Sequence, residues 1–372
     1  MPKEQERIKV VEPVMGREEL RNASEVIRTN WLSWRGEYVK KFQQGFASYI
    51  GMRYGVATTS CTTALHLALA TLGIGRGDNV IVPAFTFIAT ANSVYYTGAE
   101  PRFVDSDKDY WCINPEKIEE KIDEHTKVIL IVHIFGHPCD MDRIMAIAKK
   151  HKLYVVEDCA QGVGSEYKGR KAGTFGIISC FSFDTTKYIT TGEGGMCLTN
   201  SAKLEKRMRI LMNLGFNLDK PVWEWFKHEH IGFNYRMTNL QAAVGVAQLK
   251  RLDWIVNKKR WIASRYRKLF EGTEGIRFAN EMPWARSSYW CSTITVRKKA
   301  RNILIRELGK NGVETRPFYH SLNLLPMYKT KYRCPVSENL GYTGFTLPSV
   351  GRMKEKHIRK VVSIVKEINE SI

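Results

Sequence analysis

The sequence predicts an α/β fold in which a mostly parallel sheet of seven strands is covered by helices on both faces. Two observations lead to this prediction. Between residues 51 and 200, seven short apolar runs are bounded by Gly, Pro or Asp, and helical patterns lie between them. The connections are short, as expected for parallel strands buried on both faces in a three-layer α/β/α arrangement. The runs cover residues 54–58, 79–83, 102–105, 127–133, 153–157, 177–183 and 195–199.

Helical patterns alternate with these runs and also precede them. Residues 18–28 form an amphipathic pattern, which the turn region TNWLSWRGEY separates from a second helix over 39–50. The segment PAFTFIATAN, residues 83–92, opens another helix. Residues 217–239 show little periodicity and many aromatic side chains, which predicts a long functional loop. Thr238 is expected to cap the helix that follows it. Further helices are expected over 62–72, 140–151, 201–214 and from 239 to about 256.

The pattern changes after about residue 258. A helix, a strand over 289–296, a helix over 300–311 and a final helix after LPSVGR predict a smaller α+β unit. We therefore expect a large domain over residues 1–257, with an N-terminal helical segment, and a small C-terminal α+β domain over 258–372.

The charge is strongly positive, with 57 basic and 38 acidic residues and a net charge of +19. The basic residues are dispersed and interleaved with acids, and no helix-turn-helix, zinc or RNP signature accompanies them, so we expect no nucleic-acid partner. A field of this sign attracts a doubly charged small molecule such as a nucleotide diphosphate.

Neither a membrane segment nor a metal site is predicted. The start, MPKEQERIKVVEP, is too polar for a signal peptide, and the longest aliphatic run, residues 128–132, is too short to span a bilayer. The eight cysteines show no CxxC or zinc spacing, so most are interpreted as small buried hydrophobes. A soluble, cytoplasmic protein is the expectation.

An acid and a lysine follow two of the predicted strands. Asp158 ends the run VVED, and Lys187 lies just beyond the run CFSF. Because ligands bind at the carboxyl ends of strands in an open α/β sheet, this pair can face one aromatic cofactor. Pyridoxal phosphate (PLP) needs a lysine for its Schiff base and an acid for its pyridine nitrogen. From spacing alone, a solvated loop lysine and a helix-capping Asp remain the alternative.

Two further segments offer cofactor contacts. TTSCTTALHLAL places Ser60, Cys61 and Thr62 at a strand-to-helix turn, where backbone N–H groups and hydroxyls can hold a phosphate. An ordinary helix cap is the alternative there. Phe87 is expected at the mouth of the sheet, either stacked on a pyridine ring or packed in the core.

These segments resemble a known family. The chain is similar to the sugar-nucleotide aminotransferases among the fold-type I PLP-dependent transferases, and most similar to the perosamine-synthase-like 4-aminotransferases. The resemblance spans nearly the whole chain. It is carried by TNWLSWRGEYVKKF, SCTTALHLAL, VIVPAFTFIATAN, VHIFGHPCDMD, VVEDCAQ, FSFDTTKYITTGEGGM, IGFNYRMTNLQAAVGVAQL, ETRPFY and GYTGFTLPS.

The resemblance implies roles for matching positions. Lys187 would form the Schiff base and move protons, Asp158 would pair with the pyridine nitrogen, and Gln161 would approach the 3-oxygen of the ring. Phe87 takes the place of the stacking aromatic residue. The phosphate would be held by Ser182, by Thr62 and by the amides of Cys61 and Thr62. Asn234 would reach the phosphate site of a neighbouring subunit, which implies a homodimer with shared active sites.

The resemblance also implies a reaction. L-Glutamate would donate its amino group, and a nucleotide-linked 4-keto-6-deoxyhexose would receive it, in the synthesis of a surface polysaccharide or another glycan. Ser33 and Arg316 are candidate substrate contacts, with a turn and a structural salt bridge as alternatives. Three departures from the subgroup, at residues 184–186, Gln161 and Asn323, are expected near the pocket. They leave a dTDP- or UDP-linked sugar, aminated at C4 or C3, as an alternative.

Other function classes remain as competitors. A deoxysugar dehydratase uses the same cofactor, but such relatives replace the lysine with His, and Lys187 argues against this class. A non-catalytic protein on the same fold would fail to bind PLP.

Overall fold

The computed structural model describes residues 7–328 and 330–371, and it places the seven predicted strands in one sheet. The strand order is β1-β9-β8-β5-β4-β2-β3. The pairings from β8 to β3 are parallel, whereas β9 is antiparallel to both of its neighbours. The prediction of a mostly parallel sheet is therefore confirmed. The strands are β1 (Tyr54–Thr58), β2 (Asn79–Pro83), β3 (Glu100–Val104), β4 (Thr126–Val132), β5 (Tyr154–Asp158), β8 (Ile178–Ser182) and β9 (Gly195–Thr199).

The antiparallel return of β9 has a simple cause. Parallel neighbours need a crossover element between them, and the helices between the earlier strands provide it. Only the loop over residues 183–194 joins β8 to β9, so the chain turns back beside the strand it has just left. This loop carries Lys187.

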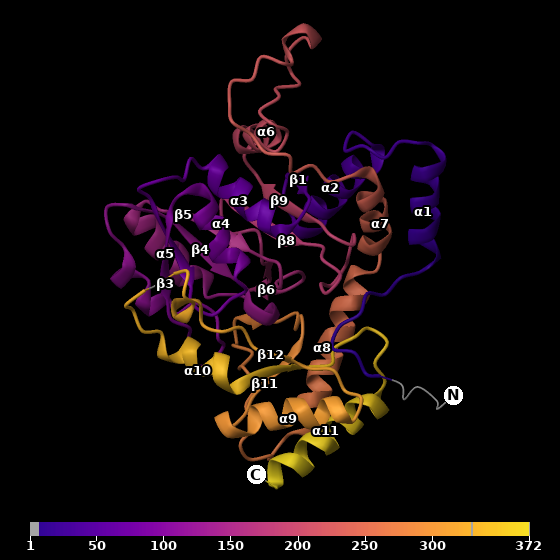
Figure 1. Cartoon of the computed structure of the whole chain (residues 1–372), viewed down its shortest axis with the longest axis vertical. Coiled ribbons are helices and arrows are strands. Elements are labelled where there is room, and N and C mark those ends of the chain that lie inside the picture. The colour runs from indigo at the N-terminus through magenta and orange to yellow at the C-terminus, as the bar shows by residue number, and fades with distance from the viewer. Residues whose placement is uncertain (1–6, 329, 372) are drawn as a thin grey trace.

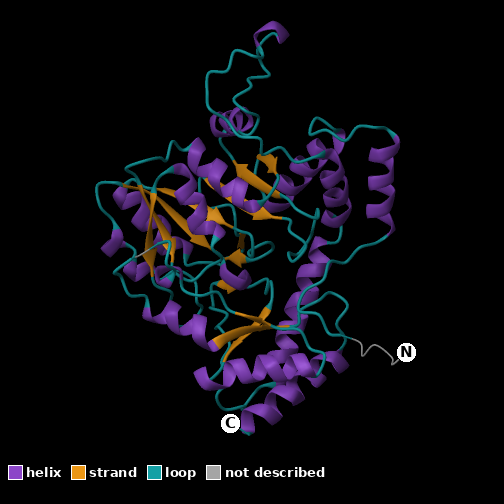
Figure 2. Ribbon diagram, viewed as in Figure 1, coloured by secondary structure: helices purple, strands orange, loops and turns teal. Residues whose placement is uncertain are grey.

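Helices cover both faces of the sheet, as Figures 1 and 2 show. Alternate strand residues separate two cores, so that Val80 packs with α3, α4 and α6 while Ile81 packs with α2 and α5. The three-layer arrangement follows from this alternation. These helices are α2 (Glu37–Ile50), α3 (Cys61–Thr71), α4 (Ala89–Thr97), α5 (Met141–His151) and α6 (Ala202–Leu211).

One helix that the sequence predicts is divided into two helices in the structure. The segment expected from 239 to about 256 forms α7 (Asn239–Leu249), and a separate helix, α8 (Leu252–Leu269), starts after a break. The N-terminal helix α1 (Arg17–Arg28) packs against α7, and α7 packs against α2. Thr238 caps α7 as predicted, because its hydroxyl accepts a hydrogen bond from the Gln241 amide.

The C-terminal part holds a three-stranded antiparallel sheet, ordered β11-β13-β12, with helices packed against it. The predicted strand over 289–296 is shorter than expected, because Tyr289 adopts a left-handed φ of 49° and the strand starts only at Ser292. The predicted domain boundary after residue 257 falls within α8. The elements are β11 (Ser292–Thr295), α9 (Lys298–Lys310), β12 (Arg316–Pro317), α10 (Pro335–Thr343), β13 (Gly344–Leu347) and α11 (Glu355–Glu370). A second small sheet joins β6 (Glu166–Tyr167), β7 (Arg170–Lys171) and β10 (Ala285–Arg286).

The predicted long loop is confirmed and extends away from the body of the molecule. We call residues 216–231 the arm; it projects beyond α6 in Figure 1. Apart from one short turn of 3-10 helix over Val222–Glu224, it has no regular structure. Trp223, Phe226 and Ile231 are at least 80% exposed. Such a surface normally packs against another protein chain.

All eight cysteines are free and buried, as the interpretation of small buried hydrophobes requires. Among the residues that the structure describes, no helix has the length and apolar character needed to cross a membrane.

Candidate active site

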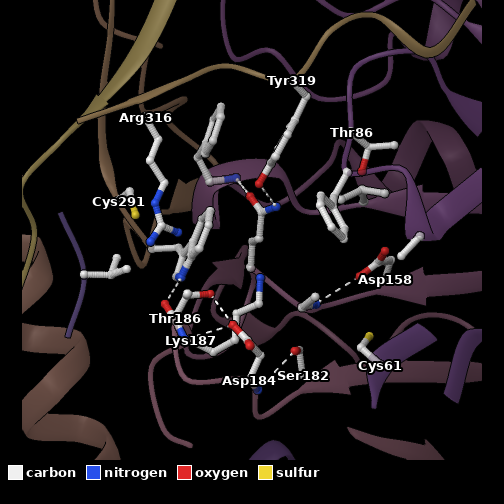
Figure 3. A pocket seen from close by; sticks show the side chains of 18 of the residues that line it. Cys61, Thr86, Asp158, Ser182, Asp184, Thr186, Lys187, Cys291, Arg316 and Tyr319 are labelled. Atoms are coloured by element: carbon white, nitrogen blue, oxygen red, sulfur yellow. Dashed lines mark hydrogen bonds between the residues drawn. The ribbon is translucent and has the colours of Figure 1, made fainter. Parts of the chain in front are cut away.

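A cavity of about 490 Å³ opens at the carboxyl ends of the parallel strands. Val132, Asp158 and Ser182, the last residues of β4, β5 and β8, line one wall. Residues from the C-terminal part, including Cys291 and Arg316, line the opposite wall (Figure 3). Trp290 also lines the cavity. The cavity lies where ligands bind in open α/β sheets.

Most of the sequence-predicted site residues meet in this cavity, although they lie far apart in the chain. The lining includes Cys61, Thr62, Phe87, Asp158, Gln161, Ser182, Lys187 and Arg316. Ser33 and Asn234 are exposed and do not line the cavity of their own chain. Asn323, which was expected near the pocket, is not among the residues that line it. It is buried outside the lining, where its amide donates hydrogen bonds to Glu338 and to the carbonyl of Tyr332.

Asp158 is held as a buried acceptor. Its two carboxylate oxygens accept hydrogen bonds from the Ala160 amide at 3.0 Å and from the Thr90 hydroxyl at 2.9 Å. Burial raises the pKa of Asp158, and these bonds together with the Lys187 charge oppose the rise. An oriented carboxylate that lacks a full counter-charge suits a cationic partner such as a protonated pyridine nitrogen.

Lys187 opens on the cavity from the loop that joins β8 to β9. Desolvation lowers the pKa of its amine, while Cys61 and Asp158 act in the opposite direction. A lowered pKa increases the fraction of neutral amine, which is the form that attacks a carbonyl carbon. Figure 3 shows Lys187 between Asp184 and the centre of the cavity.

The side-chain amide of Gln161 is fixed at both ends. Its oxygen accepts a hydrogen bond from the Phe135 amide at 2.8 Å, and its nitrogen donates one to the Tyr319 hydroxyl at 3.1 Å. Phe135 has a left-handed φ of 52° in the short 3-10 turn Ile134–Gly136 that follows β4, and its N–H donates to Gln161. The second hydrogen on the Gln161 nitrogen remains for a ligand oxygen, as its predicted contact with the cofactor requires.

The first turn of α3 fits a phosphate. Ser60 caps this helix through its hydroxyl, which accepts a bond from the Thr63 amide. The amides of Cys61 and Thr62 belong to the first turn of a helix, where backbone N–H groups have no intrahelical acceptor. A side chain at Gly195 would lie 2.2 Å from the Ser60 carbonyl oxygen, so only glycine lets β9 approach this turn. The residues present therefore suit the phosphate of PLP.

The aromatic residue at the mouth is Phe87, which is 53% exposed. Its ring meets the Tyr319 ring edge to face, with centroids 5.7 Å apart. An exposed face on a cavity wall is available for stacking on a planar ligand.

A buried polar network lies behind the site. His133 donates to a Glu157 oxygen at 3.0 Å and accepts a bond from the Cys139 amide at 3.1 Å. The two ring nitrogens of His133 are thus both occupied by protein groups. Burial works to raise the pKa of Glu157, but hydrogen bonds from His133 and the amides of Gly176 and Gly173 hold it below its usual value. With Cys159, these side chains have the types of a metal site, but hydrogen bonds already occupy His133 and Glu157.

Sequence reasoning missed several residues of the site. Thr90, Phe135 and Tyr319 contact Asp158 or Gln161, and Trp290 covers Lys187. Thr90 lies in the segment predicted to open a helix, but only the folded structure shows that its hydroxyl reaches Asp158 at the end of β5. No sequence signal distinguishes Trp290 from an ordinary strand residue.

Comparison with known proteins identifies the family. The profile of the DegT/DnrJ/EryC1/StrS aminotransferase family matches residues 13–366. The chain belongs to this family. GDP-perosamine synthase from Escherichia coli O157:H7 is 41% identical over 365 residues, covering 98% of each chain. UDP-N-acetyl-3-dehydro-alpha-D-glucosamine 3-aminotransferase from Acidithiobacillus ferrooxidans is 35% identical over 338 residues, covering 89% of this chain and 88% of the relative.

Solved structures agree with this assignment. A Streptococcus pneumoniae protein, solved in a PLP form and a PMP form, matches each time with a TM-score of 0.92 at 27% identity. The match covers 98% of this chain and 98–99% of the other. The predicted fold class and the PLP cofactor are thereby confirmed, and the chain is a PLP-dependent aminotransferase.

Proposed function

We propose that this aminotransferase moves an amino group from L-glutamate to a nucleotide-linked 4-keto-6-deoxyhexose, in the cytoplasm, for surface polysaccharide or other glycan synthesis. The observation that carries the proposal is that Lys187 and Asp158 line one cavity in a chain so similar to GDP-perosamine synthase. Bound PLP supplies the electron sink for amino transfer. The protein supplies orientation, charge and proton movement.

Each residue has a definite task in this reaction. Lys187 holds the cofactor before the amino donor arrives, and its free amine then moves the proton at the amino-bearing carbon. Asp158 keeps the pyridine nitrogen protonated, because a carboxylate bonded by Thr90 and Ala160 stays fixed and ionised beside a cation. Gln161 donates to the 3-oxygen of the ring. Ser182 and the first turn of α3 hold the phosphate.

A homodimer completes the site in this proposal. Asn234 is exposed, does not line its own cavity, and follows an arm with exposed aromatic side chains. These facts support a second copy that receives the arm and accepts Asn234 at its phosphate site. Ser33 is exposed as well, so we assign it a substrate contact only across the subunit boundary.

Arg316 is the proposed contact for an anionic part of a substrate. It lines the cavity, its side chain is 47% exposed, and its nearest carboxylate, Glu314, is 3.7 Å away. An ion pair this loose contributes little to stability, so Arg316 can readily exchange Glu314 for a ligand carboxylate or phosphate.

A second candidate substrate is a UDP-linked 3-keto sugar. The Acidithiobacillus relative is named for that reaction and is 35% identical to this chain. Asp184 and Gln161, two of the departures from the perosamine-synthase-like pattern, line the cavity. They are therefore placed to change sugar selection.

The proposal is tested by the visible absorption spectrum of the purified protein with PLP, before and after L-glutamate is added. A band of the lysine-bound cofactor that bleaches with glutamate is expected, and Lys187→Ala should lose the band. The loaded enzyme is then offered GDP-, dTDP- and UDP-linked keto sugars, and the product is identified by mass spectrometry. No band at all, or a deoxygenated sugar in place of an amino sugar, would refute the proposal.

A further inference from the structure

We propose that Trp290 is a positioning residue that holds the free amine of Lys187 against the face of its indole ring. The inference rests on the proposed function in one respect, since it takes Lys187 to be the lysine that alternates between bound and free forms. It assigns a role to a residue that neither the sequence pattern nor the family resemblance singled out.

The contact itself is close and sheltered. The Lys187 Nζ atom lies 4.3 Å from the centroid of the Trp290 ring, within the range of a cation–π interaction. Trp290 is only 6% exposed, and Lys187 is partly buried where it lines the cavity. In the described part of the chain, Lys187 Nζ has no hydrogen-bond partner. The ring face is therefore its principal holder.

Trp290 is fixed by contacts on several sides, so the ring does not meet Lys187 by chance. Its indole N–H donates to the carbonyl of Thr186, the residue before the lysine, at 2.8 Å. Its backbone N–H donates to the Phe135 carbonyl, and its ring lies nearly parallel to the Phe135 ring, at an angle of 4°. The indole thus binds both the backbone and the side chain of the lysine-bearing loop.

A buried lysine fixes Trp290 from behind. Lys259 on α8 is 5% exposed, and its ammonium group donates to the carbonyls of Trp290 at 2.8 Å and Ser349 at 3.1 Å. Burying a charged amine costs desolvation free energy, and the two carbonyl acceptors offset only part of that cost. Here Lys259 anchors the tryptophan and, being positive, disfavours a shift of the Lys187 ammonium towards α8.

A ring face suits this task better than a carboxylate. An ion pair inside the cavity would bind the ammonium strongly and keep it protonated, whereas a cation–π contact attracts it more weakly and leaves it free to move. Other groups also act on Lys187, and the ring competes with them for the amine. They are Asp158 from β5, Cys61 from α3, Asp184 from the same loop, Cys291 beside Trp290, and Lys259 from α8.

The test measures the pKa of Lys187 in the cofactor-free protein, through the pH dependence of its acylation as followed by mass spectrometry. Trp290→Leu removes the π face but keeps an apolar group. Because the ring favours the charged amine, we expect the pKa of Lys187 to fall by about one unit in this variant, so that the lysine is acylated about tenfold faster at neutral pH. Trp290→Phe keeps a ring face and should lie between wild type and Trp290→Leu.

Controls separate this effect from general damage. Trp284→Leu removes an indole from a different aromatic cluster, around Tyr110 and His137, and should leave the pKa of Lys187 unchanged. If Trp290→Leu does not fold, Trp290→Phe against wild type still decides the question. An unchanged or raised pKa of Lys187 in the Trp290 variants overturns the proposal. A missing PLP band in wild type would refute the proposed function, whereas the pKa of Lys187 in the variants would still show whether the indole ring holds the amine.

Discussion

The two walls of the cavity are built in different ways. The sheet-side wall consists of residues at strand ends and at the start of α3, such as Asp158, Ser182 and Thr62. The opposite wall comes from irregular backbone around Trp290 and from β12 with the two residues that follow it. The sheet-side wall, with Lys187 from the loop beside it, carries the groups proposed to hold PLP and perform the chemistry, whereas the opposite wall carries groups that orient them and contact substrate. The following predictions test this division, in order of decreasing effect.

The largest effect is expected on the sheet-side wall. Asp158→Asn keeps the size of the side chain but removes its charge, so turnover should fall at least about 10²-fold while PLP still binds. Single-turnover absorbance with L-glutamate measures this loss. Thr90→Val is the matched control, since it removes one hydrogen bond to the carboxylate and should cost far less. Equal losses in the two variants would contradict the proposed role of the charge.

The buried Asp158 carboxyl also predicts how the stability of the cofactor-free protein changes with pH. Burial raises the pKa of Asp158, so the folded cofactor-free protein binds this proton more tightly than the unfolded chain. Stability is therefore lost as the pH rises from the ordinary carboxyl value of 3.8 through the raised value. Cofactor-free Asp158→Asn should gain stability over wild type at pH 7 and show no gain below pH 4. Urea unfolding at the two pH values measures the difference.

The next effect is expected at the first turn of α3, where the phosphate of PLP is proposed to bind. Gly195→Ala would place a methyl group 2.2 Å from the Ser60 carbonyl oxygen, so β9 and the first turn of α3 must separate. We expect a loss of about 2 kcal/mol in stability and at least about tenfold weaker PLP binding. Gly73→Ala provides the comparison, because it adds a methyl group at a left-handed glycine with open space around it. It should cost stability without weakening PLP binding.

A smaller effect is expected on the opposite wall. Arg316→Met removes a positive charge that an anionic substrate group can contact. The KM of one substrate should therefore rise about tenfold, while PLP binding stays unchanged. Steady-state kinetics with glutamate and sugar nucleotide varied in turn shows which substrate Arg316 contacts. A change in the PLP dissociation constant would contradict the division between the walls.

The smallest effect is expected at Tyr319. Tyr319→Phe removes one hydrogen bond from the Gln161 amide, which still accepts from Phe135. A bond of this kind contributes about 1 kcal/mol, which corresponds to about a fivefold change in turnover. The pH–rate profile should keep its shape, because no titrating group of the reaction changes.

The same division explains what the sequence predicted. All seven runs became strands of the large sheet, because their apolar character and bounding residues are local signals. Asp158 and Ser182 could be placed at strand ends, and Lys187 just beyond one, for the same reason. The role of Trp290 was missed, since it depends on a left-handed Tyr289 and on contacts with Phe135 and Thr186, which no local pattern encodes.

Two further failures have a similar origin. The break between α7 and α8 lies in a stretch without Pro or Gly, so tertiary packing rather than composition ends the first helix. Asn323 was expected near the pocket from the family resemblance, but it does not line the cavity. A buried network with Glu338 takes it elsewhere. Side-chain direction in an irregular segment is set by distant partners.

The length of α8 has a mechanical consequence. Leu252 and Ile255 are buried in the core beside the large sheet, whereas Ile262 and Tyr266 are buried in the core of the C-terminal part. One uninterrupted helix without Pro or Gly thus passes through both cores and connects the large sheet to the C-terminal part. A change in the width of the cavity would therefore have to bend this helix or shift its packing in one of the two cores.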